Sequence, residues 1–221
     1  MRPSRRVRWA AGVAFAAILL SSCEPQSPRE ATRSSPSANP PPPTAGQTSG
    51  GSRDSDLEPG LHISVGTSHY RVRGSSLSEL RSGIARHGPG KFDAVTKWST
   101  QYAFTSAPEA DLCSAENVRV DLSVEFVLPK WSPFAGAPAA LRSAWSDYSS
   151  ALRRHESVHK RIAEAGAREL LLALRDLGSL PCERLDQAAA RIARRSVRQT
   201  NERQRHYDDL TNHGASQGVV L

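Results

Sequence analysis

Two histidines and a glutamate lie within one five-residue stretch, His155-Glu156-Ser157-Val158-His159. On a helix, four residues turn about 400°, so the two imidazole rings lie on one face, about 40° apart. Both rings can then bind one zinc ion, while Glu156 lies beside the metal, where it can take a proton from water. This HExxH pattern therefore indicates a zinc site that activates water for hydrolysis.

A charged, solvated helix face is the alternative explanation of the same stretch. Four basic side chains flank the histidines, namely Arg153, Arg154, Lys160 and Arg161. However, Leu152, Val158 and Ile162 bracket the histidines within a sector of about 120°, so the histidines face the interior and the basic residues face water. Buried histidines need partners, and a metal ion supplies one to both rings at once.

The third zinc ligand must come from another part of the chain. The extended metzincin pattern requires a glycine and a histidine where this sequence has Ile162 and Ala165, which excludes that family. If the second of two long helices returns antiparallel to the first, it brings residues 207–218 near His155. We therefore expect His213 to be the third ligand, with Glu183 as the alternative.

Two residues close to His213 in the sequence have expected roles of their own. Tyr207 is expected to stabilise the oxyanion of a scissile carbonyl, or alternatively to pack in the interior. Asp208 is expected to orient a ligand histidine from outside the coordination shell. If Asp208 or His206 were instead a fourth protein ligand, the site would be structural, because catalytic zinc keeps one position open for water.

The elements that hold these residues follow from hydrophobic periodicity. Alternating patterns predict strands at 61–73, 94–106 and 117–129, the last two antiparallel, joined by a loop with Cys113 and ended by Pro129. Ser76 and Glu79 form a capping box that begins a short helix. Spacings of three and four then predict one long helix up to about Leu177 and another from Cys182 to about Arg205.

The predicted fold class is accordingly α+β. It comprises a small antiparallel sheet with a short helix, followed by two long packed helices, the first of which carries HExxH. This domain occupies residues 59–221.

The first 22 residues have the features of a bacterial lipoprotein signal peptide. Arginines precede a short apolar run, and Leu20-Ser21-Ser22-Cys23 resembles a lipobox, which makes Cys23 the lipidated residue. An ordinary signal peptide cleaved nearby is the alternative. Residues 23–58 are rich in Pro, Ser and Gly, which predicts a disordered tether. The chain is therefore expected to be exported and anchored in the cell envelope.

Charge and cysteine usage agree with an exported protein. Removing the four arginines of residues 1–22 lowers the formal net charge from +7 to +3, which with the exported location argues against a nucleic acid partner. Cys113 and Cys182 form an even pair in an oxidising compartment, so we expect a disulfide between them rather than two free thiols.

The order of several short stretches resembles a known bacterial family. These stretches are YRVRG, the cysteine before VRVDLSVEFVLPKW, AWSDYSSAL, HESVH, the second cysteine and YDDLTNHGASQG. The chain from about residue 61 to 218 is similar to uncharacterised secreted proteins described as predicted secreted zinc-dependent proteases. The resemblance implies a domain like that of a metallopeptidase.

Two functions remain open at this point. The first is a lipid-anchored zinc peptidase that cleaves a peptide, a protein or a peptide of the cell wall. The second is a non-catalytic envelope lipoprotein in which zinc stabilises a binding domain. Glu156 favours the first, because a purely structural site has no use for a glutamate beside the metal.

Overall fold

The computed structural model describes residues 7–8, 14–15 and 58–221 of the chain. The predicted lipidation site Cys23, the tether as far as residue 57 and most of the predicted signal peptide lie outside the described residues. Within the described part of the chain, no helix combines the length and the apolar character required to cross a membrane.

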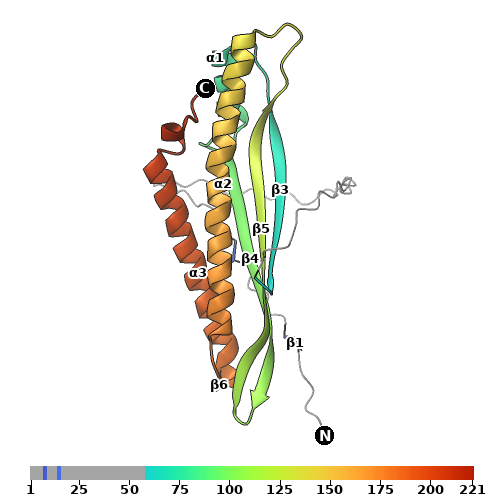
Figure 1. The fold of residues 1–221 in the computed structure, drawn as a ribbon, viewed down its shortest axis with the longest axis vertical. Helices are drawn as coiled ribbons and strands as arrows, with labels where there is room; N and C mark the ends of the chain where they lie inside the picture. Colours follow the sequence, from blue (N-terminus) through green and yellow to red (C-terminus); the bar gives the residue numbers. More distant parts are fainter. Residues whose placement is uncertain (1–6, 9–13, 16–57) are drawn as a thin grey trace, which may run out of the picture. The chain divides into compact units, whose positions relative to one another are not determined.

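The domain is built on a mixed sheet, in which three long strands do most of the pairing (Figure 1). These are β3 (Leu61–Val72), β4 (Val95–Glu109) and β5 (Leu112–Trp131), in the spatial order β4-β5-β3. β4 and β5 form an antiparallel hairpin, whereas β3 pairs with β5 in parallel along its whole length. In the part of the chain that the structure describes, three two-residue strands complete the sheet: β1 (Val7–Arg8), β2 (Ala14–Phe15) and β6 (Leu180–Pro181).

The α+β class is confirmed, but the prediction of an antiparallel sheet is wrong for β3. Alternation of side chains shows that a segment is a strand, and it is the same in parallel and antiparallel strands. β3 lies beside β5 and not beside β4, and it pairs with β5 in parallel. The local side-chain pattern does not show which strand will be the neighbour, so it does not predict this direction.

The β4–β5 hairpin is also longer than predicted. The strands continue to a tight turn at Ala110 and Asp111, so Cys113 lies in β5 and not in a loop. Pro129 does not end β5, which continues to Trp131. Pro129 pairs with Tyr70 of β3. On the β4 side the pairing ends two residues earlier, where Val127 pairs with Val95, the first residue of β4. Proline is tolerated there because one side of β5 has become an edge, where a missing N–H costs little.

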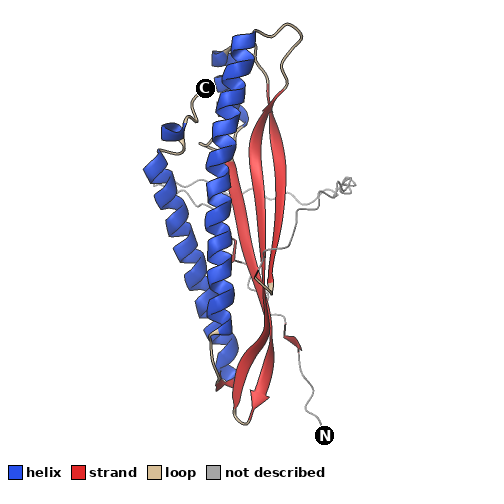
Figure 2. Ribbon diagram, viewed as in Figure 1, coloured by secondary structure: helices blue, strands red, loops and turns tan. Residues whose placement is uncertain are grey.

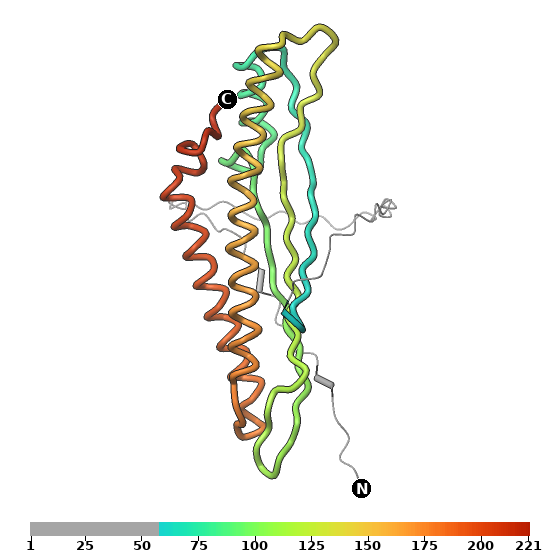
Figure 3. Tube along the Cα trace, viewed as in Figure 1, coloured from blue at the N-terminus to red at the C-terminus, as the bar shows by residue number. Residues whose placement is uncertain are grey.

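Among the described residues, three α-helices accompany the sheet, and Figure 2 draws helices in blue and strands in red. α1 (Leu77–His87) begins with the predicted cap, in which Ser76 Oγ accepts a hydrogen bond from the Glu79 backbone N–H. α2 (Ala139–Arg175) runs along the sheet, and α3 (Cys182–Thr211) packs antiparallel against α2, as the tube in Figure 3 shows. α3 therefore extends about six residues beyond its predicted end, a difference that carries Tyr207 and Asp208 into the helix.

The core lies between α2 and the sheet. The buried face of α2 contributes Ala163, Leu170 and Leu171, and β5 contributes Val120 and Leu122. On its other side α2 approaches α3 closely at Gly166, where a Cβ atom would lie 2.1 Å from Thr200 Oγ1. This contact fixes the relative position of the two helices that carry the candidate site.

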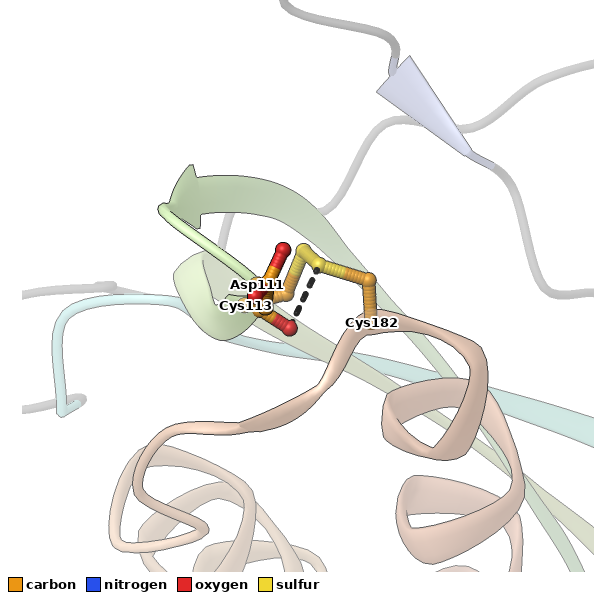
Figure 4. Close-up of a disulfide and its surroundings, with 3 residues drawn as sticks. All are labelled: Asp111, Cys113 and Cys182. Atoms are coloured by element: carbon orange, nitrogen blue, oxygen red, sulfur yellow. Dashed lines mark hydrogen bonds between the residues drawn. A yellow bond between two sulfur atoms is a disulfide. The ribbon is translucent and has the colours of Figure 1, made fainter.

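Cys113 and Cys182 form a disulfide that joins β5 to the first residue of α3 (Figure 4). The two cysteines are 69 positions apart in the sequence. A crosslink across such a span reduces the entropy of the unfolded chain, which by the chain-entropy model stabilises the native state by roughly 4 kcal/mol.

Replacing both Cys113 and Cys182 with alanine is therefore expected to lower the free energy of unfolding by about 2–4 kcal/mol. The measurement is urea denaturation followed by circular dichroism, with the oxidised wild type as reference. Reduced wild type serves as a second reference, because it lacks the crosslink but retains both sulfur atoms. Equal stability of the wild type in its oxidised and reduced forms would contradict the prediction.

Candidate metal centre

His155 and His159 lie one turn apart on α2 and meet the carboxylate of Asp208 near the end of α3. The two Nε2 atoms are 3.2 Å apart. Asp208 Oδ1 lies 2.9 Å from His159 Nε2 and 3.3 Å from His155 Nε2. These three side chains form a group whose candidate ligand atoms all lie within 4.8 Å of one another.

Two glutamines hold the histidine rings in orientation through contacts with their Nδ1 atoms, on the side away from Asp208. Gln217 Oε1 lies 3.0 Å from His155 Nδ1, and Gln204 Oε1 lies 2.5 Å from His159 Nδ1. Gln204 also donates a hydrogen bond from Nε2 to the His159 backbone carbonyl, which assigns its side-chain oxygen to the imidazole. A carbonyl oxygen can only accept, so His159 Nδ1 carries a proton and, in the neutral ring, its Nε2 presents a lone pair; the Gln217 oxygen beside His155 Nδ1 favours the same tautomer there.

The donor set fits a zinc ion. The two Nε2 atoms and Asp208 Oδ1 lie within 3.3 Å of one another, and unshared electron pairs at such distances repel unless a cation or protons lie between them. Around a tetrahedral zinc with bonds of about 2.0 Å, adjacent ligand atoms are roughly 3.3 Å apart. The observed separations of 2.9, 3.2 and 3.3 Å are close to this value. Zinc accepts both imidazole and carboxylate ligands.

Charges within the cluster stabilise one another. Burial acts to raise the pKa of Asp208, but hydrogen bonds and charge from His155 and His159 outweigh it and hold that pKa well below its usual value. Burial acts to lower the pKa of His159, but the hydrogen bond and charge of Asp208 outweigh it and raise that pKa. Asp208 is thus present as a carboxylate at neutral pH, which is the form a metal requires.

Glu156 lies on the sheet side of α2 and is 4% exposed. Its Oε2 atom accepts a hydrogen bond of 2.6 Å from Thr96 Oγ1 of β4. Burial raises the pKa of Glu156, although the Thr96 hydrogen bond and the nearby histidines oppose this shift. A raised pKa makes the carboxylate a better proton acceptor, as a general base requires.

The structure brings Tyr207 against the cluster. Its ring stacks on His155 with centroids 4.9 Å apart, and its hydroxyl donates to Gln217 Oε1 over 3.0 Å. The Tyr207 hydroxyl and His155 Nδ1 therefore share one hydrogen-bond partner, the side-chain oxygen of Gln217. The predicted contact of Tyr207 with a substrate oxyanion stays a prediction.

His213 lies beside the cluster and not within the group of three. Its side chain is 53% exposed, its ring contacts Phe92, and its Nδ1 is 3.9 Å from Asp208 Oδ1. His206 is exposed, and Glu183 lies in the first turn of α3, 25 residues before Asp208. That separation corresponds to about 38 Å along the helix axis, which removes Glu183 from the site.

Thr96, Gln204 and Gln217 contact the site but were not predicted from the sequence. Each contacts a site residue between 45 and 62 positions away in the chain, so no short spacing pattern contains it. Asp208 was expected to orient a ligand histidine from outside the coordination shell, with a fourth protein ligand as the alternative. The structure instead places its carboxylate directly against both Nε2 atoms.

A tight turn after α3 holds Gln217 over the site. Asn212, His213 and Gly214 all have positive φ angles, which reverse the chain so that a short 3₁₀ helix (Ala215–Gln217) lies beside α2. A Cβ atom on Gly214 would lie 3.1 Å from His155 Cγ and 2.7 Å from Val219 Cγ2. Glycine is therefore required both by the backbone angle and by the closeness of His155.

Gly214→Ala is expected to destabilise the domain and to weaken zinc binding by displacing His155. Gly136→Ala is the matched control, because both glycines have φ of 84° but nothing lies within 4 Å of a Cβ at Gly136. Both variants should lose about 1 kcal/mol from backbone strain. Only Gly214→Ala should also lose zinc affinity, measured by competition with a chromogenic chelator. Equal zinc affinity in the two variants would refute this coupling.

The geometry defines the class of protein as an α+β domain with a candidate metal centre made by two histidines of one helix and an aspartate of the next. The chain belongs to the family described as "Bacterial protein of unknown function (DUF922)", whose sequence profile matches residues 67–214. Searches of curated proteins and of solved structures gave no significant match.

Proposed function

We propose that this protein is a zinc-dependent peptidase of the bacterial cell envelope, exported and held to a membrane through a lipid on Cys23. The observation that carries the proposal is the convergence of His155 Nε2, His159 Nε2 and Asp208 Oδ1 next to a buried glutamate. His155, His159 and Asp208 would hold the metal. His213 remains outside this set but close enough to contact a substrate at the exposed side of the cluster.

When bound, zinc supplies a Lewis acid that polarises a carbonyl group and lowers the pKa of water to about 7. Glu156 accepts a proton from the attacking water and later delivers it to the leaving amine. Thr96 keeps the Glu156 carboxylate in position through its hydrogen bond. Gln204 and Gln217 hold the imidazole rings in the tautomer that leaves each Nε2 free for the metal.

A non-catalytic zinc site is the second candidate, and His213 is the observation that favours it. Its Nδ1 lies only 3.9 Å from Asp208 Oδ1, so a change of side-chain rotamer could add a fourth protein ligand. A closed set of four ligands would leave no position for water. Against this, a structural site does not explain a glutamate that is 4% exposed beside the cluster.

The test uses residues 23–221 with Cys23→Ser, purified with and without zinc. We expect one zinc per chain, and hydrolysis of unstructured polypeptides such as casein that a chelator stops and added zinc restores. One zinc per chain without hydrolysis would favour the structural site. No bound zinc after zinc-replete purification would refute both candidates.

A further inference from the structure

We propose that the edge of β4 opposite β5 binds an extended polypeptide substrate as an added antiparallel strand, with the carboxyl end of the bound segment directed toward Glu156. The inference rests on the proposed function for the hydrolytic step. Binding at the edge requires no metal and can be measured separately.

This edge offers a long row of backbone groups. β4 spans Val95–Glu109 and pairs with β5 on one side. On its other side, the only pairing found among the described residues is with the two-residue strands β1 and β2. An unpaired strand edge is a template for an added strand, because its N–H and C=O groups lack partners.

The two short strands show how an occupant lies on the edge. β1 places Val7 opposite Thr105, and β2 places Ala14 and Phe15 opposite Thr100 and Ser99, all antiparallel. Both belong to the segment that the sequence predicts to be removed with the signal peptide. Removal of that segment would take away β1 and β2, the partners that this edge has among the described residues, and another extended polypeptide could pair with the same backbone groups.

The direction of pairing leads the occupant toward the candidate catalytic glutamate. As the occupant's residue numbers increase from 14 to 15, their β4 partners decrease from Thr100 to Ser99. Continued in this register, the occupant reaches Thr96, which lies about 10 Å beyond Ser99 along β4. The hydroxyl of Thr96 donates a hydrogen bond to Glu156. The β4 edge would therefore bind the residues that precede the scissile bond. Hydrolysis would occur about four residues after the substrate residue that pairs with Thr100.

Recognition of this kind selects a chemical class of substrate. Backbone hydrogen bonds depend little on side-chain identity, and they require a run of free N–H and C=O groups in extended conformation. From Thr105 to Thr96 the edge is about 30 Å long, which only an unfolded or extended polypeptide of about ten residues fills. We infer that the substrate is an extended protein segment rather than a short cell-wall peptide.

The experiment is site-specific disulfide crosslinking on metal-free protein of residues 23–221 carrying Cys23→Ser. The probe is a synthetic peptide with the sequence of residues 5–18, RRVRWAAGVAFAAI. Ser99→Cys is combined with Phe15→Cys in the peptide, and Thr105→Cys with Val7→Cys. The swapped combinations, Ser99→Cys with Val7→Cys and Thr105→Cys with Phe15→Cys, report the opposite strand direction. Ser68→Cys on β3 is the control for the other edge of the sheet.

We expect the two matched pairs to crosslink at least about tenfold faster than the swapped pairs and than Ser68→Cys, because directly opposed residues place their Cβ atoms within about 5.5 Å. Equal rates for matched and swapped pairs, preferential crosslinking to Ser68→Cys or no crosslinking at all would each overturn the proposal. Because the protein is free of metal, none of these outcomes depends on hydrolysis. A protein that crosslinks as expected but binds no zinc would refute the proposed function and leave the edge site standing.

Discussion

Asp208→Ala is expected to lower zinc affinity more than about 100-fold, since even residues that merely orient ligands contribute 10–100-fold. The carboxylate lies 2.9 Å and 3.3 Å from the two Nε2 atoms and supplies the only negative charge in the group of three. Without it, two imidazoles alone would have to hold the ion. The measurement is zinc content after gel filtration, together with affinity from chelator competition.

Two matched variants make this result specific. Asp209→Ala removes the adjacent carboxylate, which is exposed and does not belong to the group of three. His213→Ala removes the residue that the sequence favoured as third ligand. Both should retain zinc within a few-fold of wild type. If His213→Ala loses zinc and Asp208→Ala retains it, then His213 is the third ligand and Asp208 is not.

Glu156→Gln is expected to lower the rate of peptide hydrolysis by about 10²–10⁴-fold, because an amide cannot accept the proton of the attacking water. The amide has nearly the same shape and can still accept the hydrogen bond from Thr96. The zinc affinity should therefore stay close to that of wild type. The measurement pairs kcat on an unstructured polypeptide with the zinc content of the same sample.

Glu164→Gln is the control for the loss of one negative charge from α2. Glu164 lies two turns further along the helix and pairs with Lys160 over 2.6 Å. This variant should keep both hydrolysis and zinc. If Glu156→Gln hydrolyses peptide as fast as Glu164→Gln, then Glu156 is not the general base and its burial has another cause.

The proximity of His155, Glu156 and His159 was predictable because it is local. On a helix, the residue spacing alone places two side chains on one face, and the hydrophobic residues around them indicate which face is inward. The same local rules gave the cap at Ser76, the existence of the long strands and helices, and the α+β class. With Cys23 assigned to the lipid, only Cys113 and Cys182 were left to pair, and the structure joins these two cysteines.

The tertiary structure decided everything that depends on how separate elements meet. Asp208 lies 49 positions from His159, and it reaches the cluster only because α3 packs antiparallel on α2 through the close contact at Gly166. The parallel direction of β3 likewise follows from the strand it adjoins. Spacing along a helix determines which residues share a face, whereas packing determines what that face meets. The sequence therefore placed His155 and His159 on one face, and the packing of α3 on α2 brought Asp208 against them.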